Sequence, residues 1–195
     1  MDMSGEVRIP ASQERVWAAL NDAETLRKAI PGCEELTKIS DTELEAVARA
    51  KVGPVSARFK GKVTLSDMHP PSGYTLTGEG TGGAAGFAKG QATVTLTPDG
   101  QGTVLHYTVK ATVGGKLAQI GQRLIDGAAK KMADEFFEQF SLLAAGGSAQ
   151  GASQSQPMPA PANENVHPSA FNLPIWVPVG VIVAGLVLLT IVLLR

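Results

Sequence analysis

The stretch from Lys116 to Leu143 most constrains how this chain can fold, because its apolar residues recur at every third or fourth position. One row consists of Leu117, Ile120, Leu124, Ala128, Met132, Phe136 and Leu143, and a second of Ile125, Ala129, Phe137 and Phe140. This spacing predicts one long amphipathic helix, with glycine pairs at 114–115 and 146–147 at its two ends. At a rise of about 1.5 Å per residue the helix would be roughly 40 Å long. Its apolar face is wide enough to be wrapped by a curved sheet.

The segments before this helix have the pattern of a sheet. Apolar and polar residues alternate from Met3 to Ile9, which predicts a first strand. Ser12 and Asp22 are positioned to cap two short helices, and six further strands are expected between residues 33 and 113. The expected fold class is therefore α+β, with a seven-stranded antiparallel curved sheet wrapped around a long C-terminal helix.

The clearest strand pair joins residues 43–52 to residues 55–67 through Gly53 and Pro54. Placing Val52 opposite Val55 puts four pairs on a common face: Leu44 with Val63, Ala46 with Gly61, Ala48 with Phe59, and Ala50 with Ala57. Most of these inner residues are small, so this part of the sheet leaves space beneath the helix. The residues leave open whether a ligand or neighbouring aromatic side chains fill that space.

The opposite face of the same hairpin is basic and carries Arg49, Lys51, Arg58, Lys60 and Lys62. Like charges placed across a strand pair are unfavourable. The cluster is therefore either ordinary solvated charge or a surface that docks on anionic lipid or on an acidic enzyme. The formal net charge of the whole chain is −1, which gives no reason to expect a nucleic-acid partner.

Groups that commonly carry catalysis are sparse. The three histidines are expected to lie apart: His69 in a turn, His106 on the outward side of a strand, and His167 beyond the folded domain. Cys33 has no histidine beside it and is expected to be a packed thiol. Glycines at 78, 80 and 83 have dinucleotide-motif spacing, but a strand pattern follows them where that motif requires a helix. The sequence therefore predicts a binding protein and not an enzyme.

Residues 1–145 are expected to form one domain, and two segments of different character follow it. Residues 146–172 are rich in Gly, Ala, Ser, Gln and Pro, which predicts a disordered linker. Residues 173–194 carry no charge and have the length of one transmembrane helix, with Trp176 at the level of the membrane interface. We therefore expect a single-pass, C-terminally anchored protein of the cytoplasmic membrane, with its domain on the cytoplasmic side.

Four stretches of this chain resemble a known family. They are LNDAETLRKAIPGCEEL (Leu20–Leu36), VGPVSARFKGKVTL (Val52–Leu65), GFAKGQATVTL (Gly86–Leu96) and GGKLAQIGQRLIDGAAKKMADEFFEQF (Gly114–Phe140). With the order of elements, they resemble the helix-grip fold of the START/polyketide-cyclase (SRPBCC) superfamily, and in particular the CoxG family of carbon monoxide dehydrogenase subunits. The resemblance covers residues 1 to about 145.

The resemblance implies a non-catalytic accessory protein that attaches an aerobic molybdenum carbon monoxide dehydrogenase, or a related molybdenum hydroxylase, to the cytoplasmic membrane. It also implies that the cavity binds a respiratory quinone, ubiquinone or menaquinone. The residues expected to line that cavity are Ala48, Phe59, Phe87, Leu117, Ile120, Leu124, Met132 and Phe136. Two alternatives remain, namely a membrane adaptor or maturation factor without a ligand, and a polyketide-cyclase-like enzyme.

Overall fold

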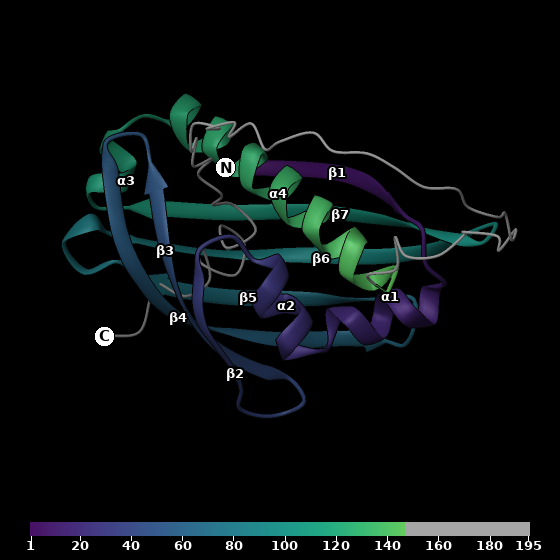
Figure 1. Cartoon of the computed structure of the whole chain (residues 1–195). Helices are drawn as coiled ribbons and strands as arrows, with labels where there is room; N and C mark the ends of the chain where they lie inside the picture. Colours follow the sequence, from purple (N-terminus) through teal and green to yellow (C-terminus); the bar gives the residue numbers. More distant parts are fainter. Residues whose placement is uncertain (147–195) are drawn as a thin grey trace, which may run out of the picture.

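The structure is a computed structural model that describes residues 1–146 (Figure 1). Its elements follow the expected order, except that the C-terminal helical segment is divided. They are β1 (Asp2–Ile9), α1 (Gln13–Leu20), α2 (Ala23–Ala29), β2 (Cys33–Lys38), β3 (Glu43–Val52), β4 (Val55–His69), β5 (Gly73–Thr81), the 3-10 turn η1 (Gly83–Ala85), β6 (Phe87–Asp99), β7 (Gly102–Gly114), α3 (Lys116–Gln119) and α4 (Gln122–Ala144).

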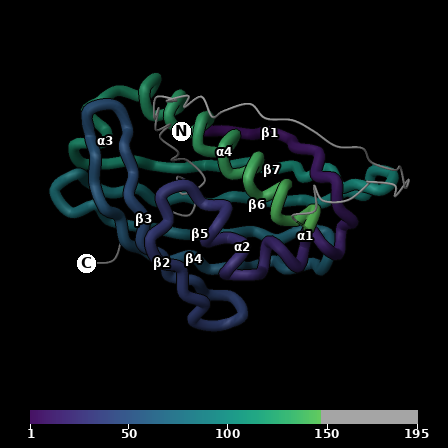
Figure 2. The backbone as a smooth tube through the Cα atoms, in the orientation of Figure 1, coloured from purple at the N-terminus to yellow at the C-terminus, as the bar shows by residue number. Residues whose placement is uncertain are grey.

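All strands belong to one seven-stranded antiparallel sheet with the order β1-β7-β6-β5-β4-β3-β2, as predicted. Strands β2 to β7 are joined in sequence, whereas β1 pairs with β7, the last strand. The predicted register of the β3–β4 hairpin is confirmed, because Ala48 lies opposite Phe59 and Arg49 opposite Arg58. The curved sheet and the helices in front of it form two layers (Figures 1 and 2).

The two short helices that cover part of the concave face begin where the sequence predicts. The Ser12 side chain accepts a hydrogen bond from the Arg15 amide at the start of α1. The Asp22 carboxylate accepts bonds from the Thr25 amide at 2.8 Å and from the Thr25 hydroxyl at 2.6 Å, which caps α2. These caps satisfy amide groups that a helix leaves unpaired at its first turn. Helix α4 then packs against α1, α2, β1 and β3.

Aromatic residues of α4 form the centre of the core. Phe136 stacks on Phe140 with ring centroids 5.2 Å apart and meets the edge of Phe137 at 5.0 Å. The Phe140 side chain is fully buried, as are Ile9 and Val16. Burying each such side chain contributes roughly 1.5–3 kcal/mol. The second predicted apolar row, which contains Phe137 and Phe140, therefore faces the sheet.

The prediction of one continuous helix from Lys116 to Leu143 is wrong. Helix α3 ends at Gln119, and α4 starts after Gly121, whose φ of +91° lies in the left-handed region that favours glycine. The Gly121 carbonyl accepts hydrogen bonds from the Leu124 and Ile125 amides, at 3.1 and 3.3 Å, and so begins the new helix. The break changes the direction of the chain, so the apolar rows of the two helices are not continuous.

Within residues 1–146, no helix combines the length and the apolar character needed to cross a membrane. The predicted span at 173–194, with Trp176, and all of the predicted linker except Gly146 lie outside the residues that the structure describes.

Candidate ligand-binding site

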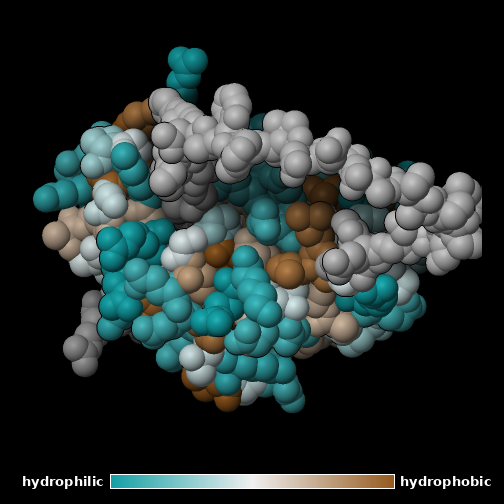
Figure 3. All heavy atoms as spheres, in the orientation of Figure 1, coloured by the Kyte–Doolittle hydropathy of each residue, from teal (hydrophilic) through white to brown (hydrophobic). Residues whose placement is uncertain are grey.

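A cavity of about 90 Å³ lies between the concave face of the sheet and helices α1, α2 and α4. Its walls come from every layer of the domain: Leu20, Asn21, Leu26, Leu36, Lys38, Asp41, Leu44, Val63, Leu65, Tyr74, Leu76, Ala92, Val94, Leu105, Tyr107, Phe136 and Phe137. Most of these side chains are apolar. In the space-filling view, apolar side chains gather near the centre of the same face, beside α2 and α4 (Figure 3).

The floor of the cavity is built by the register of the central strands. Leu65 of β4 lies opposite Leu76 of β5, which lies opposite Ala92 of β6. One row further along, Tyr74 lies opposite Val94, which lies opposite Tyr107 of β7. Neighbours on one face of a sheet pack side by side, so these two rows form a continuous surface. The small side chain of Ala92 leaves the gap that the cavity occupies.

The charged groups of the cavity wall lie at its rim. Lys38, the last residue of β2, and Asp41, in the β2–β3 turn, form an ion pair of 3.1 Å, and the Asp41 side chain is fully exposed. Asn21, between α1 and α2, donates a hydrogen bond to the Trp17 carbonyl at 2.9 Å. The cavity therefore opens to solvent where these two connections meet. An exposed pair of this kind contributes little to stability.

Tyr74 provides a polar group inside this apolar cavity. The residue is 7% exposed, and its ring packs edge-on against Trp17 with the centroids 5.7 Å apart. Burial raises the pKa of Tyr74 well above its ordinary value, so the hydroxyl remains protonated and can donate a hydrogen bond. Among residues 1–146, no group accepts that bond. No side-chain polar atom of the described residues is both fully buried and unpaired, so the Tyr74 hydroxyl keeps contact with space that water or a ligand can reach.

Tyr107 forms the neighbouring part of the wall. Its ring stacks on Phe137 with the centroids 5.1 Å apart. Burial, and secondarily the Asp134 carboxylate, raise the pKa of Tyr107. A Cβ atom at Gly5, directly across the strands, would lie only 2.5 Å from the Tyr107 hydroxyl. The glycine at position 5 therefore makes room for this ring.

The residues predicted to line the cavity have different positions in the structure. Phe136 lies in its wall. The other buried members pack in the hydrophobic core outside that wall: Ala48, Phe59, Leu117 and Met132. Ile120 is half-buried at the end of α3. Leu124 and Phe87 are 54% and 36% exposed. The ligand-binding role predicted for these residues stays a prediction.

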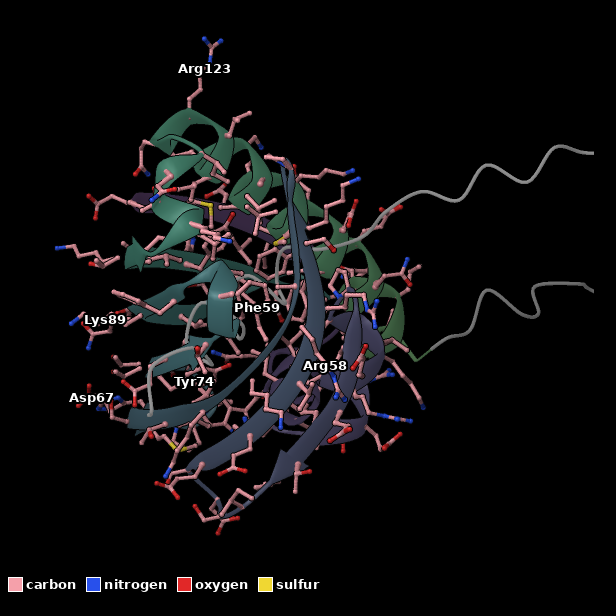
Figure 4. The ribbon with its side chains drawn as sticks, turned by 90° about the vertical axis from the view of Figure 1, so that its left-hand side faces the viewer. Arg58, Phe59, Asp67, Tyr74, Lys89 and Arg123 are labelled. Atoms are coloured by element: carbon pink, nitrogen blue, oxygen red, sulfur yellow. The ribbon has the colours of Figure 1, made fainter. Side chains whose placement is uncertain are left out.

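The glycine-rich segment has a packing role that explains two of these positions. A Cβ atom at Gly82 would collide with the Phe59 ring, and one at Gly114 would collide with the Phe87 ring. Each aromatic ring therefore lies directly on a glycine, which allows close approach to the backbone. Figure 4 shows Phe59 pointing into the curved sheet, whereas the preceding residue along β4, Arg58, points out of it.

The basic residues of the outer face are largely neutralised. Glu34 forms ion pairs with Arg49, at 3.4 Å, and with Arg58, and hydrogen bonding from Arg58 is the main cause of the lowered pKa of Glu34. Lys62 pairs with Glu43 at 2.7 Å. The five cations share one face as predicted, but the docking role proposed for them stays a prediction. The half-buried Cys33 thiol lies 3.4 Å from the Glu35 carbonyl, and burial raises the pKa of Cys33.

Several solved structures are similar to this domain. A protein from Geobacillus kaustophilus is 33% identical, with a TM-score of 0.70 over 74% of this chain and 95% of that one. A Thermus thermophilus protein is 15% identical (TM-score 0.57, 76% of this chain and 100% of that one). The ZhuI aromatase/cyclase from Streptomyces sp. R1128 is 12% identical (TM-score 0.53, 74% and 93%) and shares the fold.

A search of curated proteins finds no match. Residues 5–145, which span β1 to α4 and therefore the whole cavity wall, match the model of one family. The chain belongs to the CoxG family of carbon monoxide dehydrogenase subunits.

Proposed function

We propose that this domain binds an isoprenoid quinone, ubiquinone or menaquinone, in the cavity beneath α4. The chain would thereby connect a molybdenum-containing carbon monoxide dehydrogenase, or a related molybdenum hydroxylase, with the quinones of the cytoplasmic membrane. The family name supports the dehydrogenase as partner. The apolar wall of the cavity supports an apolar ligand, because each buried methylene contributes about 0.8 kcal/mol.

The unpaired hydroxyl of Tyr74 is the observation that carries the proposal. A quinone is an apolar ring with two carbonyl oxygens that accept hydrogen bonds but cannot donate them. Tyr74 offers a donor without a competing partner inside the apolar wall. Such a bond discriminates between a quinone and a plain hydrocarbon of the same shape.

The cavity is smaller than a quinone, which determines how the ligand would bind. An apolar cavity of about 150 Å³ in another protein accommodates benzene, whereas this cavity measures about 90 Å³. It admits a small apolar group, so a complete quinone must displace side chains as it binds. The rim between Asn21 and the β2–β3 turn is the natural entrance, because two short connections meet there without regular strand pairing.

The membrane anchor completes the proposal. Residues 173–194, with Trp176 at the interface, would hold the chain in the cytoplasmic membrane, and the linker at 146–172 would give the domain its reach. Tethering keeps the domain at a high local concentration beside its ligand and its partner. The domain would lie on the cytoplasmic side.

A cyclase-like enzyme is the competing function, since ZhuI shares the fold. The cavity wall argues against it. Within the described part of the chain, the wall contains no histidine, cysteine or serine, and its one carboxylate, Asp41, lies fully exposed at the rim. Proton transfer needs a positioned titratable group within hydrogen-bonding reach of the substrate, and Tyr74, whose pKa is raised, is a poor base.

Extraction of bound lipid from the purified domain tests the proposal. Residues 1–146 purified without detergent from a quinone-producing host should release quinone into organic solvent, as detected by mass spectrometry. The Geobacillus protein shows that this domain is a suitable sample. It is 33% identical, and 95% of its length aligns with only 74% of this chain. It is therefore a folded protein of little more than domain length. Absence of quinone, together with no binding of added quinone, would leave the adaptor without a ligand as the better account.

A titration supplies the second measurement. Trp17 is the single tryptophan of residues 1–146 and contacts Tyr74, so quinone binding should quench its fluorescence. Tyr74→Phe keeps the ring and removes the donor, and it should weaken binding by about 2- to 12-fold, the equivalent of one hydrogen bond of about 0.5–1.5 kcal/mol. Tyr107→Phe is the matched control. Equal affinity in wild type and Tyr74→Phe would refute the assigned donor.

A further inference from the structure

One end of the domain is formed by three connections: residues 50–57, 80–89 and 111–124, which we call the α3 end. Adjacent antiparallel strands alternate in direction, so the β3–β4 turn, the β5–β6 connection and the β7–α4 connection emerge on the same side. Contacts of η1 with both β4 and α3 bring them together. Gly53 of the β3–β4 turn lies beside the Leu124 side chain. These segments share the left-hand end of the molecule in Figure 1.

The three segments of the α3 end carry only basic charge. They contain no aspartate or glutamate. Four exposed cations lie there, and within residues 1–146 none of them has an ion-pair partner: Lys51, Lys89, Lys116 and Arg123. The nearest carboxylates in register or sequence are Asp2, opposite Lys110, Glu79, opposite Lys89, and Asp126, which accepts a hydrogen bond from Gln122 at 2.6 Å. Figure 4 looks onto this end and shows Lys89 and Arg123 pointing outward from its edge.

Apolar side chains are exposed between these cations. Leu124 is 54% exposed and Phe87 is 36% exposed. Val52, Val55 and Ile120 are half-buried around them. Exposed apolar groups that are surrounded by polar residues commonly mark an interaction surface. At the opposite end of the sheet, by contrast, Asp41 pairs with Lys38 at 3.1 Å and Asp99 pairs with Arg8 at 3.0 Å.

We propose that the α3 end docks on the surface of an anionic lipid bilayer. Cations without partners suit a surface of phosphate headgroups, and the apolar side chains between them suit the region just below those headgroups. Lysine and arginine side chains on flexible stems match a fluid surface better than a shaped protein pocket. The other end of the sheet, whose cations Lys38 and Arg8 are already paired with carboxylates, would point away from the bilayer, so the domain would have one preferred orientation. This proposal does not depend on the identity of the ligand.

Vesicle sedimentation tests the proposal with residues 1–146, which lack the predicted anchor. The domain should sediment with vesicles of phosphatidylcholine and phosphatidylglycerol, and far less with phosphatidylcholine alone. Lys116→Glu with Arg123→Glu should lower the partition coefficient at least about 25-fold, since each cation near such a surface contributes about fivefold. The matched control, Arg8→Glu with Arg15→Glu, makes the same charge change at exposed positions of the other end of the sheet and should leave binding near the wild-type value.

The contribution of the apolar groups is tested separately. Leu124→Ser should weaken binding to the same vesicles, and its high exposure predicts an unchanged melting temperature. No sedimentation at low salt would overturn the proposal. An acidic protein surface would then be the better partner for the α3 end. Equal losses in the two double variants would also overturn it, because net charge alone would then explain binding. Quinone extraction is a separate measurement, so this proposal and the proposed function can fail independently.

Discussion

Ala92 and Ala48 provide a matched pair of substitutions that tests whether the cavity is real. Both alanines are 1% exposed and both lie on the concave face of the sheet. Ala92 lies in the cavity wall, whereas Ala48 packs in the core outside it. Replacing each with leucine adds the same three carbon atoms. The difference between the two variants therefore reports the space in front of each site.

The magnitude follows from the volumes. One water molecule takes about 10–15 Å³ on the measure used for cavities, so the cavity of about 90 Å³ has room for the three added carbon atoms. Ala92→Leu should therefore change the free energy of unfolding by less than about 1.5 kcal/mol. Ala48 packs in the core and does not line this cavity, so Ala48→Leu should cost about 1–3 kcal/mol by overpacking. For a domain of this length, 1 kcal/mol corresponds to about 3 °C in Tm.

Two assays on each variant complete the test. Thermal unfolding measures stability, and the quench of Trp17 by quinone measures binding. We expect Ala92→Leu to keep its Tm and lose quinone binding, and Ala48→Leu to show a lower Tm and retain binding below it. If Ala92→Leu is destabilised as much as Ala48→Leu and still binds quinone, the cavity described here is not the binding site.

Two further predictions concern the helices. Gly127→Ala should raise the free energy of unfolding by about 0.5–1 kcal/mol in a denaturant titration, because Gly127 lies inside α4 and a Cβ atom there meets nothing within 4 Å; an unchanged midpoint would contradict this. Asp22→Ala should cost about 1 kcal/mol at neutral pH through loss of the α2 cap. The Thr25 hydrogen bonds lower the pKa of Asp22, so its contribution is lost as the pH falls below the ordinary value of 3.8. The difference from wild type should therefore shrink in acid, and a deficit that persists there would argue against the capping carboxylate.

Much of the fold could be predicted because local signals agree with one another. Alternating polarity identified the strands, and the two-residue turn at Gly53 and Pro54 determined the register of β3 with β4. The division of the last helix was missed for a physical reason. Gly121 lies within a regular apolar period, and one glycine in a helix is compatible with that pattern; only the left-handed φ reveals the break.

The site was harder to predict than the fold. Periodicity gives the face on which a residue lies, but not its position along that face, so Ala48 and Phe136 looked equivalent although only Phe136 reaches the cavity. Phe87 comes directly after η1 and Gly86. The glycines indicated an irregular backbone there, but not the direction in which the Phe87 side chain points. Tyr74 was missed, although it shares the parity of Leu76 on the same strand, because a hydroxyl without a partner is visible only in three dimensions.

The pairing of β1 with β7 has a consequence for how the protein is made. Residues 2–9 leave the ribosome first but find their partners only at residues 103–110, so the sheet stays incomplete until most of the domain has been synthesised. The concave face then still lacks α4, which supplies the buried rings Phe136 and Phe140. A nascent chain of this protein therefore carries an uncovered apolar surface late into translation, and chaperones that recognise such surfaces should associate with it until residue 144 has emerged.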